Sequence, residues 1–199
     1  MRPEILILIV IAVAVLAAAA LITWFALSRW RSKKLHDKFG SEYDYTLEKA
    51  GDQRTAERTL VEREKRVNQL NIHTLDENER DRYQGDWLQI QADFVDDPSK
   101  SVKDADRLIT EVMIARGFPV ADFEQRAEDL SVLYPESVSN YRNAHTIATN
   151  NGGNGSHGTS TEDLRQAMVV YHSLFEVLVG PMKVEESKNN GKVKELITQ

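Results

Sequence analysis

The five histidines are the residues best suited by type to acid–base chemistry or metal binding. They are His36, His73, His145, His157 and His172. None lies four residues from another, so no two form a chelating pair on one helix face. His145 falls on the apolar stripe of its predicted helix, and His172 flanks the stripe of the last helix. If these two helices pack antiparallel, both histidines approach two tyrosines, and the candidate pocket consists of Tyr141, His145, Tyr171 and His172. A histidine simply packed in the core is the alternative.

The absence of catalytic motifs excludes several classes of enzyme. The chain has no Walker loop, dinucleotide-binding fingerprint, His-Glu-x-x-His pair or nucleophile elbow. It has no cysteine, which excludes a disulfide framework, a thiolate metal site and a cysteine nucleophile. The acidic residues between Asp76 and Asp81 lack the spacing and the glycine of a calcium loop. We therefore predict no cofactor, no metal and no catalytic residue, and the sequence does not establish an enzyme.

The charge of the chain argues against a nucleic-acid partner. Its 199 residues include 25 Lys and Arg against 31 Asp and Glu, a formal net charge of −6, whereas nucleic-acid binders present a basic surface. Without residues 1–34 the net charge is near −10, which favours a protein partner or a basic ligand. Residues 53–70, rich in Glu and Arg, are the predicted interaction arm. Its candidate partner contacts are Arg63, Lys65 and Arg66.

Apolar residues recur at helical spacing after residue 34. A first stripe predicts a helix over residues 35–50, and a second, thin stripe predicts one over 53–70. The capping-box pattern from Thr74 to Glu77 opens another helix. Further helices are expected from Pro98 to Gly117, from Asp122 to Leu133, from Pro135 to Ala148 and from Ser160 to Gly180. No stretch alternates as a strand does, so we predict an all-α fold with about six helices after the N-terminal apolar segment.

That N-terminal segment is an apolar run from Ile5 to Leu27. As a helix it would be roughly 34 Å long, enough for the ~30 Å hydrocarbon core of a lipid bilayer. It predicts one transmembrane helix, in contact with the bilayer through residues 5–27. Basic residues follow it, so the positive-inside rule places the C-terminal domain in the cytoplasm. The predicted membrane-interface residues are Trp24, Arg29, Trp30, Arg31, Lys33 and Lys34.

A cleaved signal peptide is the alternative interpretation of the same run. Three alanines at positions 18–20 offer a cleavage site, and the helical domain would then be exported. However, the first four residues make a poor n-region, and the apolar residues continue past the alanines to Phe25. We therefore predict a retained anchor over 1–34, a helical domain over 35–180 with a flexible loop at 150–160, and a disordered tail over 181–199.

Six short segments between residues 39 and 178 carry a family resemblance. They are Phe39–Asp44 (FGSEYD), Phe94–Pro98 (FVDDP), Asp104–Leu108 (DADRL), Asp122–Ala127 (DFEQRA), Asn140–Arg142 (NYR) with Ala144-His145 (AH), and Ser160–Met168 (STEDLRQAM). In these segments the chain resembles a group of uncharacterised bacterial single-span membrane proteins with a helical soluble domain. The resemblance implies a bacterial inner-membrane location and supplies no activity. Where that group often has Asp-His before a proline, this chain has Leu133-Tyr134.

These patterns predict a non-enzymatic protein-interaction module at the cytoplasmic face of a bacterial inner membrane. The first alternative is a membrane-tethered enzyme or small-ligand binder, with a pocket near Tyr141, His145 and Tyr171. The second alternative is an exported helical domain. The identity of the protein partner stays open.

Overall fold

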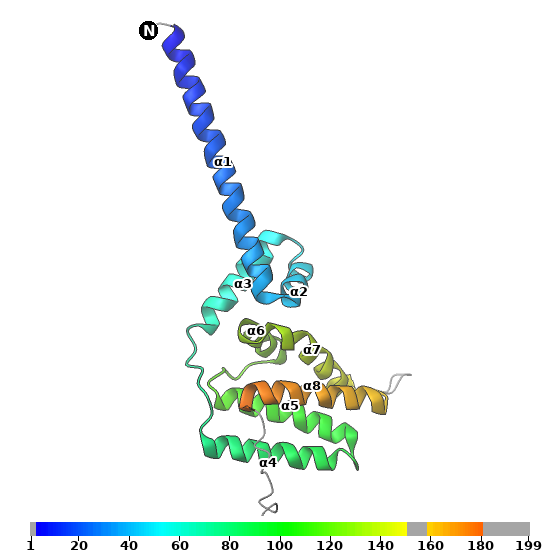
Figure 1. Ribbon diagram of the computed structural model, residues 1–199. Coiled ribbons are helices and arrows are strands. Elements are labelled where there is room, and N and C mark those ends of the chain that lie inside the picture. The colour runs from blue at the N-terminus through cyan, green and yellow to red at the C-terminus, as the bar shows by residue number, and fades with distance from the viewer. Residues whose placement is uncertain (1–2, 151–158, 181–199) are drawn as a thin grey trace, which may run out of the picture. The chain divides into compact units, whose positions relative to one another are not determined.

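The computed structural model describes residues 3–150 and 159–180, except for the side chains of residues 3–14, 24, 27, 28 and 150. The described residues form eight helices and no strand, which confirms the all-α prediction. The helices are α1 (Pro3–Phe39), α2 (Ser41–Ala50), α3 (Gln53–Val67), α4 (Glu77–Asp93), α5 (Pro98–Ala115), α6 (Phe123–Leu133), α7 (Pro135–Asn150) and α8 (Thr161–Val179), labelled in Figure 1. Most of the predicted loop at 150–160, and all of the predicted tail at 181–199, lie outside the described residues.

Short polar side chains fix where most of these helices begin. At five N-termini the side chain of the N-cap residue accepts a hydrogen bond from the backbone N–H three residues later; these residues are Asp52, Asp76, Asp97, Asp122 and Ser160. Such a cap satisfies one of the N–H groups that a helix start leaves without a partner. The predicted capping box lies two residues further along than expected, because Asp76 pairs with Glu79. Proline begins α5 and α7, as predicted.

The predicted helix over residues 35–50 is interrupted at Gly40. This glycine has φ 51°, in the region that residues with a Cβ rarely adopt. Residues 35–39 therefore belong to the end of α1, and α2 begins at Ser41. At the other end of α2, Gly51 has φ 76° and donates its N–H to the carbonyl of Leu47, which is the expected helix stop.

The prediction of an N-terminal transmembrane anchor is corrected by the structure. Among the described residues, no helix combines the length and the apolar character that a membrane crossing requires. Charged side chains follow from Arg29 onward. The prediction that this is a single-pass transmembrane protein is corrected with it. The predicted cellular location is not tested and stays a prediction.

The chain divides into two compact units, where the sequence predicts one domain over 35–180. Unit 1 comprises Met1–Asn71 and Phe118–Asn143, and unit 2 comprises Ile72–Gly117 and Ala144–Gln199. The boundary crosses α7 between residues 143 and 144. Each unit therefore combines two separate segments of the chain.

In unit 1, α2 packs on α3, and α3 packs on α6 (Figure 1). The end of α1 contacts α2 and α3. Fully buried apolar side chains fill the space between these helices; they include Phe39, Leu60, Leu130, Val138 and Tyr141. The ring of Tyr141 lies 5.0 Å from that of Phe123, tilted by 54°. Edge-to-face contacts of this kind stabilise aromatic pairs beyond their buried area.

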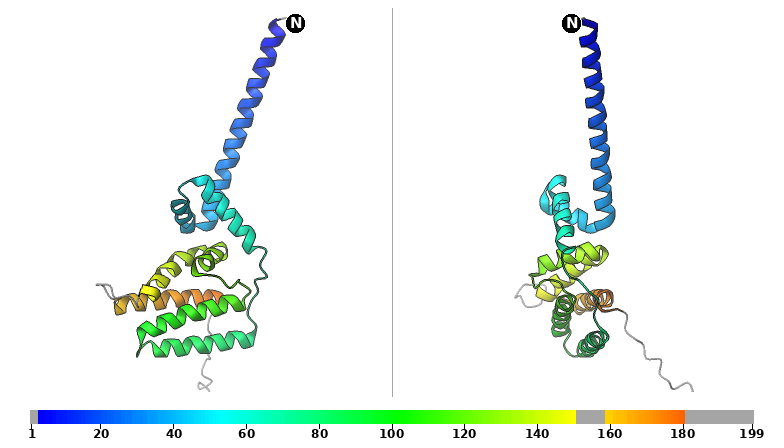
Figure 2. Two further views of the ribbon diagram at one scale, coloured as in Figure 1. Left: turned by 180° about the vertical axis from the view of Figure 1, so that it is seen from behind. Right: turned by 90° about the vertical axis from the view of Figure 1, so that its left-hand side faces the viewer.

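In unit 2, α4, α5 and α8 lie side by side, as both views in Figure 2 show. Trp87 of α4 is fully buried and stacks on Phe175 of α8, with ring centroids 5.0 Å apart. Arg116, at the end of α5, connects two further segments of unit 2. Its guanidinium donates to the carbonyl oxygens of His73 and Leu178, which connects the chain before α4 with the end of α8.

Candidate functional site

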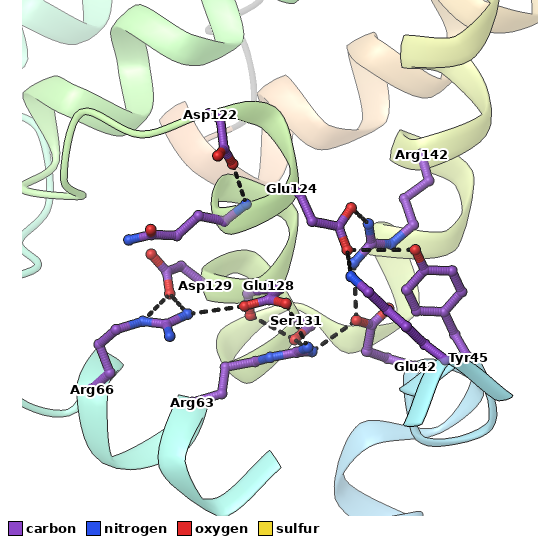
Figure 3. A network of polar contacts seen from close by, with 12 residues as sticks. Glu42, Tyr45, Arg63, Arg66, Asp122, Glu124, Glu128, Asp129, Ser131 and Arg142 are labelled. Atoms are coloured by element: carbon purple, nitrogen blue, oxygen red, sulfur yellow. Dashed lines mark hydrogen bonds and ion pairs between the residues drawn. The ribbon is translucent and has the colours of Figure 1, made fainter. Parts of the chain in front are cut away.

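A buried ion network holds the centre of unit 1 (Figure 3). Oε1 of Glu42, on α2, accepts hydrogen bonds from Nη1 of Arg63, on α3, at 2.8 Å, and from Nη2 of Arg142, on α7, at 3.1 Å. Glu42 is 2% exposed, Arg63 3% and Arg142 12%. Taking such charges out of water is unfavourable unless each finds a partner. The network meets that condition by joining three helices at one carboxylate oxygen.

The network continues onto α6 through a second arginine. Nε and Nη2 of Arg66 both donate to Oδ1 of Asp129, at 3.0 and 2.6 Å, and Nη2 also approaches Glu128. Nη1 of Arg63 donates to Oγ of Ser131 at 3.0 Å. The side chains of Asp129 and Ser131 are almost completely buried. These contacts fix α3 against α6 and explain why a helix with so few apolar residues packs at all.

Glu124, at the start of α6, closes the network on the side of α2 and α7. It accepts hydrogen bonds from Nζ of Lys49, at 2.7 Å, and from Nη1 of Arg142, at 2.5 Å. Burial by itself raises the pKa of Glu124. The hydrogen bonds and positive charges of Lys49 and Arg142 outweigh burial, so the pKa lies below its ordinary value of 4.5. Glu124 is therefore a stable anion at neutral pH and not a proton carrier.

The structure separates the three predicted partner contacts. Arg63 is buried, with Glu42 and Ser131 as partners, so its guanidinium faces the interior of unit 1. Arg66 is 40% exposed but holds Asp129. Of the three, Lys65 alone is fully on the surface, and it forms no ion pair with the described residues. The charged arm predicted over 53–70 is therefore an integral helix of unit 1.

Two residues of the predicted pocket meet in unit 2, at a carboxylate that the sequence did not indicate. The hydroxyl of Tyr171, on α8, donates to Oδ1 of Asp106, on α5, at 2.9 Å. Nδ1 of His145, on α7, lies 3.1 Å from the same oxygen. Asp106 and His145 are about one fifth exposed, and Tyr171 is fully buried. The cluster connects three helices through a single acceptor.

The other two residues of the predicted pocket lie elsewhere. Tyr141 belongs to unit 1, where it packs on Phe123. His172 is in unit 2 but stacks on Trp87, with ring centroids 5.3 Å apart and planes 28° from parallel. Within the described residues, no group of three or more His, Cys, Asp or Glu side chains is placed to hold a metal ion.

A surface groove in unit 1, between α1 and α3, has a different character. It is lined by Arg31, Lys34, Leu35 and Lys38 of α1 and by Arg54, Glu57, Arg58, Val61, Glu62 and Glu64 of α3. Five of these ten side chains are basic and three are acidic. The two apolar ones are Leu35, which is buried, and Val61, which is 50% exposed. We call this feature the α1–α3 groove.

The acidic side chains of the α1–α3 groove are largely engaged within the protein. Glu64 accepts from Nζ of Lys38 at 2.7 Å. Glu57 accepts from Nε2 of Gln53 at 2.8 Å and from the hydroxyl of Tyr43 at 3.1 Å. Burial raises the pKa of Glu57, but the hydrogen bonds from Ser32, Gln53 and Tyr43 outweigh it and the net pKa is lowered.

By contrast, four basic side chains of the groove have no acidic side chain of the described residues within ion-pair distance. They are Arg31, Lys34, Arg54 and Arg58, and none forms an ion pair with any described residue. Their spacing in the sequence indicates that they share helix faces. Arg58 follows Arg54 by four residues and Lys34 follows Arg31 by three, so each pair lies on one face of its helix.

The predicted interface residues at the end of α1 contribute to the same surface. Arg31 and Lys34 line the α1–α3 groove. Trp30 is 64% exposed, and Nζ of Lys34 lies 5.9 Å from the centre of its ring. Arg29 lies over the ring of Phe25 at 4.5 Å. Lys33 is exposed, and the side chain of Trp24 lies outside the described residues.

Comparisons with protein-family models, with curated proteins and with solved structures each find no match for this chain. The resemblance to single-span bacterial proteins therefore stays a prediction. Two features of the protein differ most in their electrostatics. In the ion network the charges are paired with one another, whereas in the α1–α3 groove four cations form no ion pair with the described residues.

Proposed function

We propose that this protein is a non-enzymatic protein-interaction module that binds an acidic, amphipathic segment in the α1–α3 groove. The observation that carries the proposal is a groove whose lining combines two apolar side chains with four cations that form no ion pair with the described residues. Unpaired arginines can each bind a carboxylate with two parallel hydrogen bonds. An exposed valine beside them supplies the apolar contact that fixes a helix in a groove.

The first alternative, an enzyme or small-ligand binder, finds less support. His145 and Tyr171 both direct a polar atom at Asp106, so their hydrogen-bonding capacity is used to hold unit 2 together. Tyr141, the third member of that hypothesis, lies in the core of unit 1 and is fully buried. A packing role accounts for all three residues without a ligand.

A peptide-binding experiment tests the proposal. The probe is a fluorescent amphipathic peptide with Glu on one face and Leu on the other, long enough for about four helical turns. We expect the full chain to bind it, measured by fluorescence anisotropy, and not to bind the same peptide with Lys in place of Glu. The double variant Arg54→Glu/Arg58→Glu should weaken binding at least tenfold, about 1.4 kcal/mol.

The matched control is Lys33→Glu/Lys65→Glu. It reverses one charge on each of the two helices that form the groove, α1 and α3. Both residues are exposed, form no ion pair with the described residues and lie outside the groove lining. It should bind the acidic peptide within about threefold of the parent, because the remaining long-range charge effect is screened beyond ~10 Å at 0.1 M salt. Equal losses in the two double variants would mean that net charge alone attracts the peptide, and the proposal would fall.

A further inference from the structure

Unit 2 carries a second groove whose chemistry mirrors that of the α1–α3 groove. It lies between α4 and α5 and is lined by Asp86, Gln89, Ile90, Asp93, Asp104, Arg107, Leu108 and Glu111. Four of these side chains are acidic and one is basic, so the lining has a formal charge of −3. We call it the α4–α5 groove. The lining of the α1–α3 groove, with five basic and three acidic side chains, has a formal charge of +2.

The two grooves also match in how charge and apolar surface are arranged. The lining of each includes two apolar side chains: Leu35 and Val61 in one, Ile90 and Leu108 in the other. In the α4–α5 groove the acidic residues come in pairs seven residues apart, at 86 and 93 and at 104 and 111. In the α1–α3 groove Arg31 and Lys38 are also seven apart. Seven residues are about 10 Å along a helix, so one pair of like charges in each groove repeats at that interval, with Lys38 already engaged by Glu64.

Internal contacts leave part of the acidic charge of the α4–α5 groove available. Asp104 is held by Lys100, at 3.1 Å, and by Arg107, at 3.0 Å. Asp93 accepts a hydrogen bond from the neutral side chain of Gln89 at 2.7 Å and forms no ion pair with the described residues. Asp86 is exposed and forms no hydrogen bond or ion pair with the described residues. The available charge therefore lies on the α4 side of the groove.

We propose that the acidic segment bound in the α1–α3 groove is the helix pair α4–α5 of a second copy of this chain. This inference rests on the proposed function, because it names the partner of the same groove. The contact joins two different surfaces, so it is heterologous. After the first contact the pair of copies retains one free basic face and one free acidic face. A second, reciprocal contact between the same two copies closes a symmetric dimer, and repetition with further copies gives a ring or an open chain.

If opposite charges drive the association, it should increase with protein concentration and decrease with salt concentration. Sedimentation velocity of the full chain, in a non-ionic detergent that covers the exposed apolar side chains of α1, measures the average mass at rising protein concentration. We expect a mass above that of one chain at about 0.05 M NaCl and a return to one chain at about 0.5 M, where the screening length falls to a few Å. Association through apolar side chains would persist or strengthen in salt, and that outcome overturns the proposal.

Two variants then test the contribution of the basic and the acidic face one at a time. Arg54→Glu/Arg58→Glu removes the basic face and leaves the acidic one, whereas Asp86→Lys/Asp93→Lys does the reverse. Each variant alone should sediment as one chain. An equimolar mixture holds one intact basic face and one intact acidic face, so it should form a complex heavier than one chain. The control Lys33→Glu/Lys65→Glu should associate as the parent does.

The outcomes separate this inference from the proposed function. If the two variants fail to combine, or if the parent chain is monomeric at every concentration in low salt, the second copy is not the partner. Should the Glu-containing peptide still bind under the same conditions, the groove binds an acidic segment of another protein and the proposed function stands. If neither the peptide nor a second copy binds, both proposals are wrong.

Discussion

Arg63 and Glu42 form an ion pair at 2.8 Å although their side chains are only 3% and 2% exposed. They lie 21 residues apart in the chain, and Arg142, 100 residues from Glu42, donates to the same carboxylate oxygen. A buried pair of this kind adds little net stability relative to apolar residues of the same size, but removing one partner leaves a buried charge without compensation. The pair therefore fixes which helices meet more than how tightly they pack.

The first prediction follows from that asymmetry. Arg63→Met should lower the free energy of unfolding by about 3 kcal/mol or more, because Glu42 and Ser131 lose a buried donor. The double variant Glu42→Leu/Arg63→Met should lose less than Arg63→Met alone, since both members of the pair are then apolar. Urea denaturation followed by circular dichroism measures both.

Lys65→Met is the matched control, two residues along the same helix but exposed and without an ion pair. Its free energy of unfolding should stay within about 0.5 kcal/mol of the parent. A loss as large as that of Arg63→Met would show that the cationic character of α3, and not the buried pair, stabilises unit 1.

The second prediction concerns acid stability. The pKa of Glu124 is lower in the folded protein than its ordinary value of 4.5, so the unfolded state binds its proton first. The contribution of Glu124 to stability is then fully present above that ordinary value and is lost as the pH falls through the folded pKa. Urea midpoints measured between about pH 6 and about pH 3.5 should fall less steeply for Glu124→Gln than for the parent. A difference between the two proteins that is the same at every pH would contradict the assignment.

The sequence predicted most of the helices because their apolar stripes and end signals agree. The apolar stripes of α4, α5 and α8 predict that Trp87, Ile109 and Phe175 face the core, and all three are fully buried. The break at Gly40 was missed, since the stripe of Leu35, Phe39 and Tyr43 continues in register across it. A stripe reports which side chains face inward, whereas a local change in φ at a glycine leaves that pattern almost unchanged.

The ion network was misread for a related reason. Arg63 lies three residues after Leu60 and four before Val67, so it occupies a position on the buried stripe of α3. Its charge suggested an exposed residue, although helical spacing alone placed it inside. Its partner Glu42 could not be identified from spacing, because residues on different helices meet only through the tertiary fold. The same limit applies to Asp106, which is invisible in the apolar stripe of α5 and yet joins His145 to Tyr171.

The third prediction tests whether Asp106 organises unit 2. Tyr171→Phe removes one hydroxyl that donates to the carboxylate at 2.9 Å and keeps the buried ring. We expect a loss of roughly 1 to 2 kcal/mol, since a hydrogen bond to a charged group contributes more than a neutral one. In an Asp106→Ala background the same substitution should cost less, and the difference between the two losses is the coupling energy of the pair. Additive losses in this double-mutant cycle would mean that the two groups do not interact.

The fourth prediction concerns Trp87, whose indole N–H is buried and has no hydrogen-bond partner among the described residues. The ring itself is fully buried and stacks on Phe175 and His172. Trp87→Ala should therefore lower the free energy of unfolding by about 3 to 5 kcal/mol, because it removes the ring and leaves a cavity. Trp87→Phe keeps an aromatic ring between α4 and α8 and removes the unpaired donor, whose burial is itself unfavourable by about 1 to 3 kcal/mol. We expect the phenylalanine variant to lose less than half as much as the alanine variant in urea denaturation. Equal losses would indicate that the indole N–H has a partner, such as a buried water, which phenylalanine cannot replace.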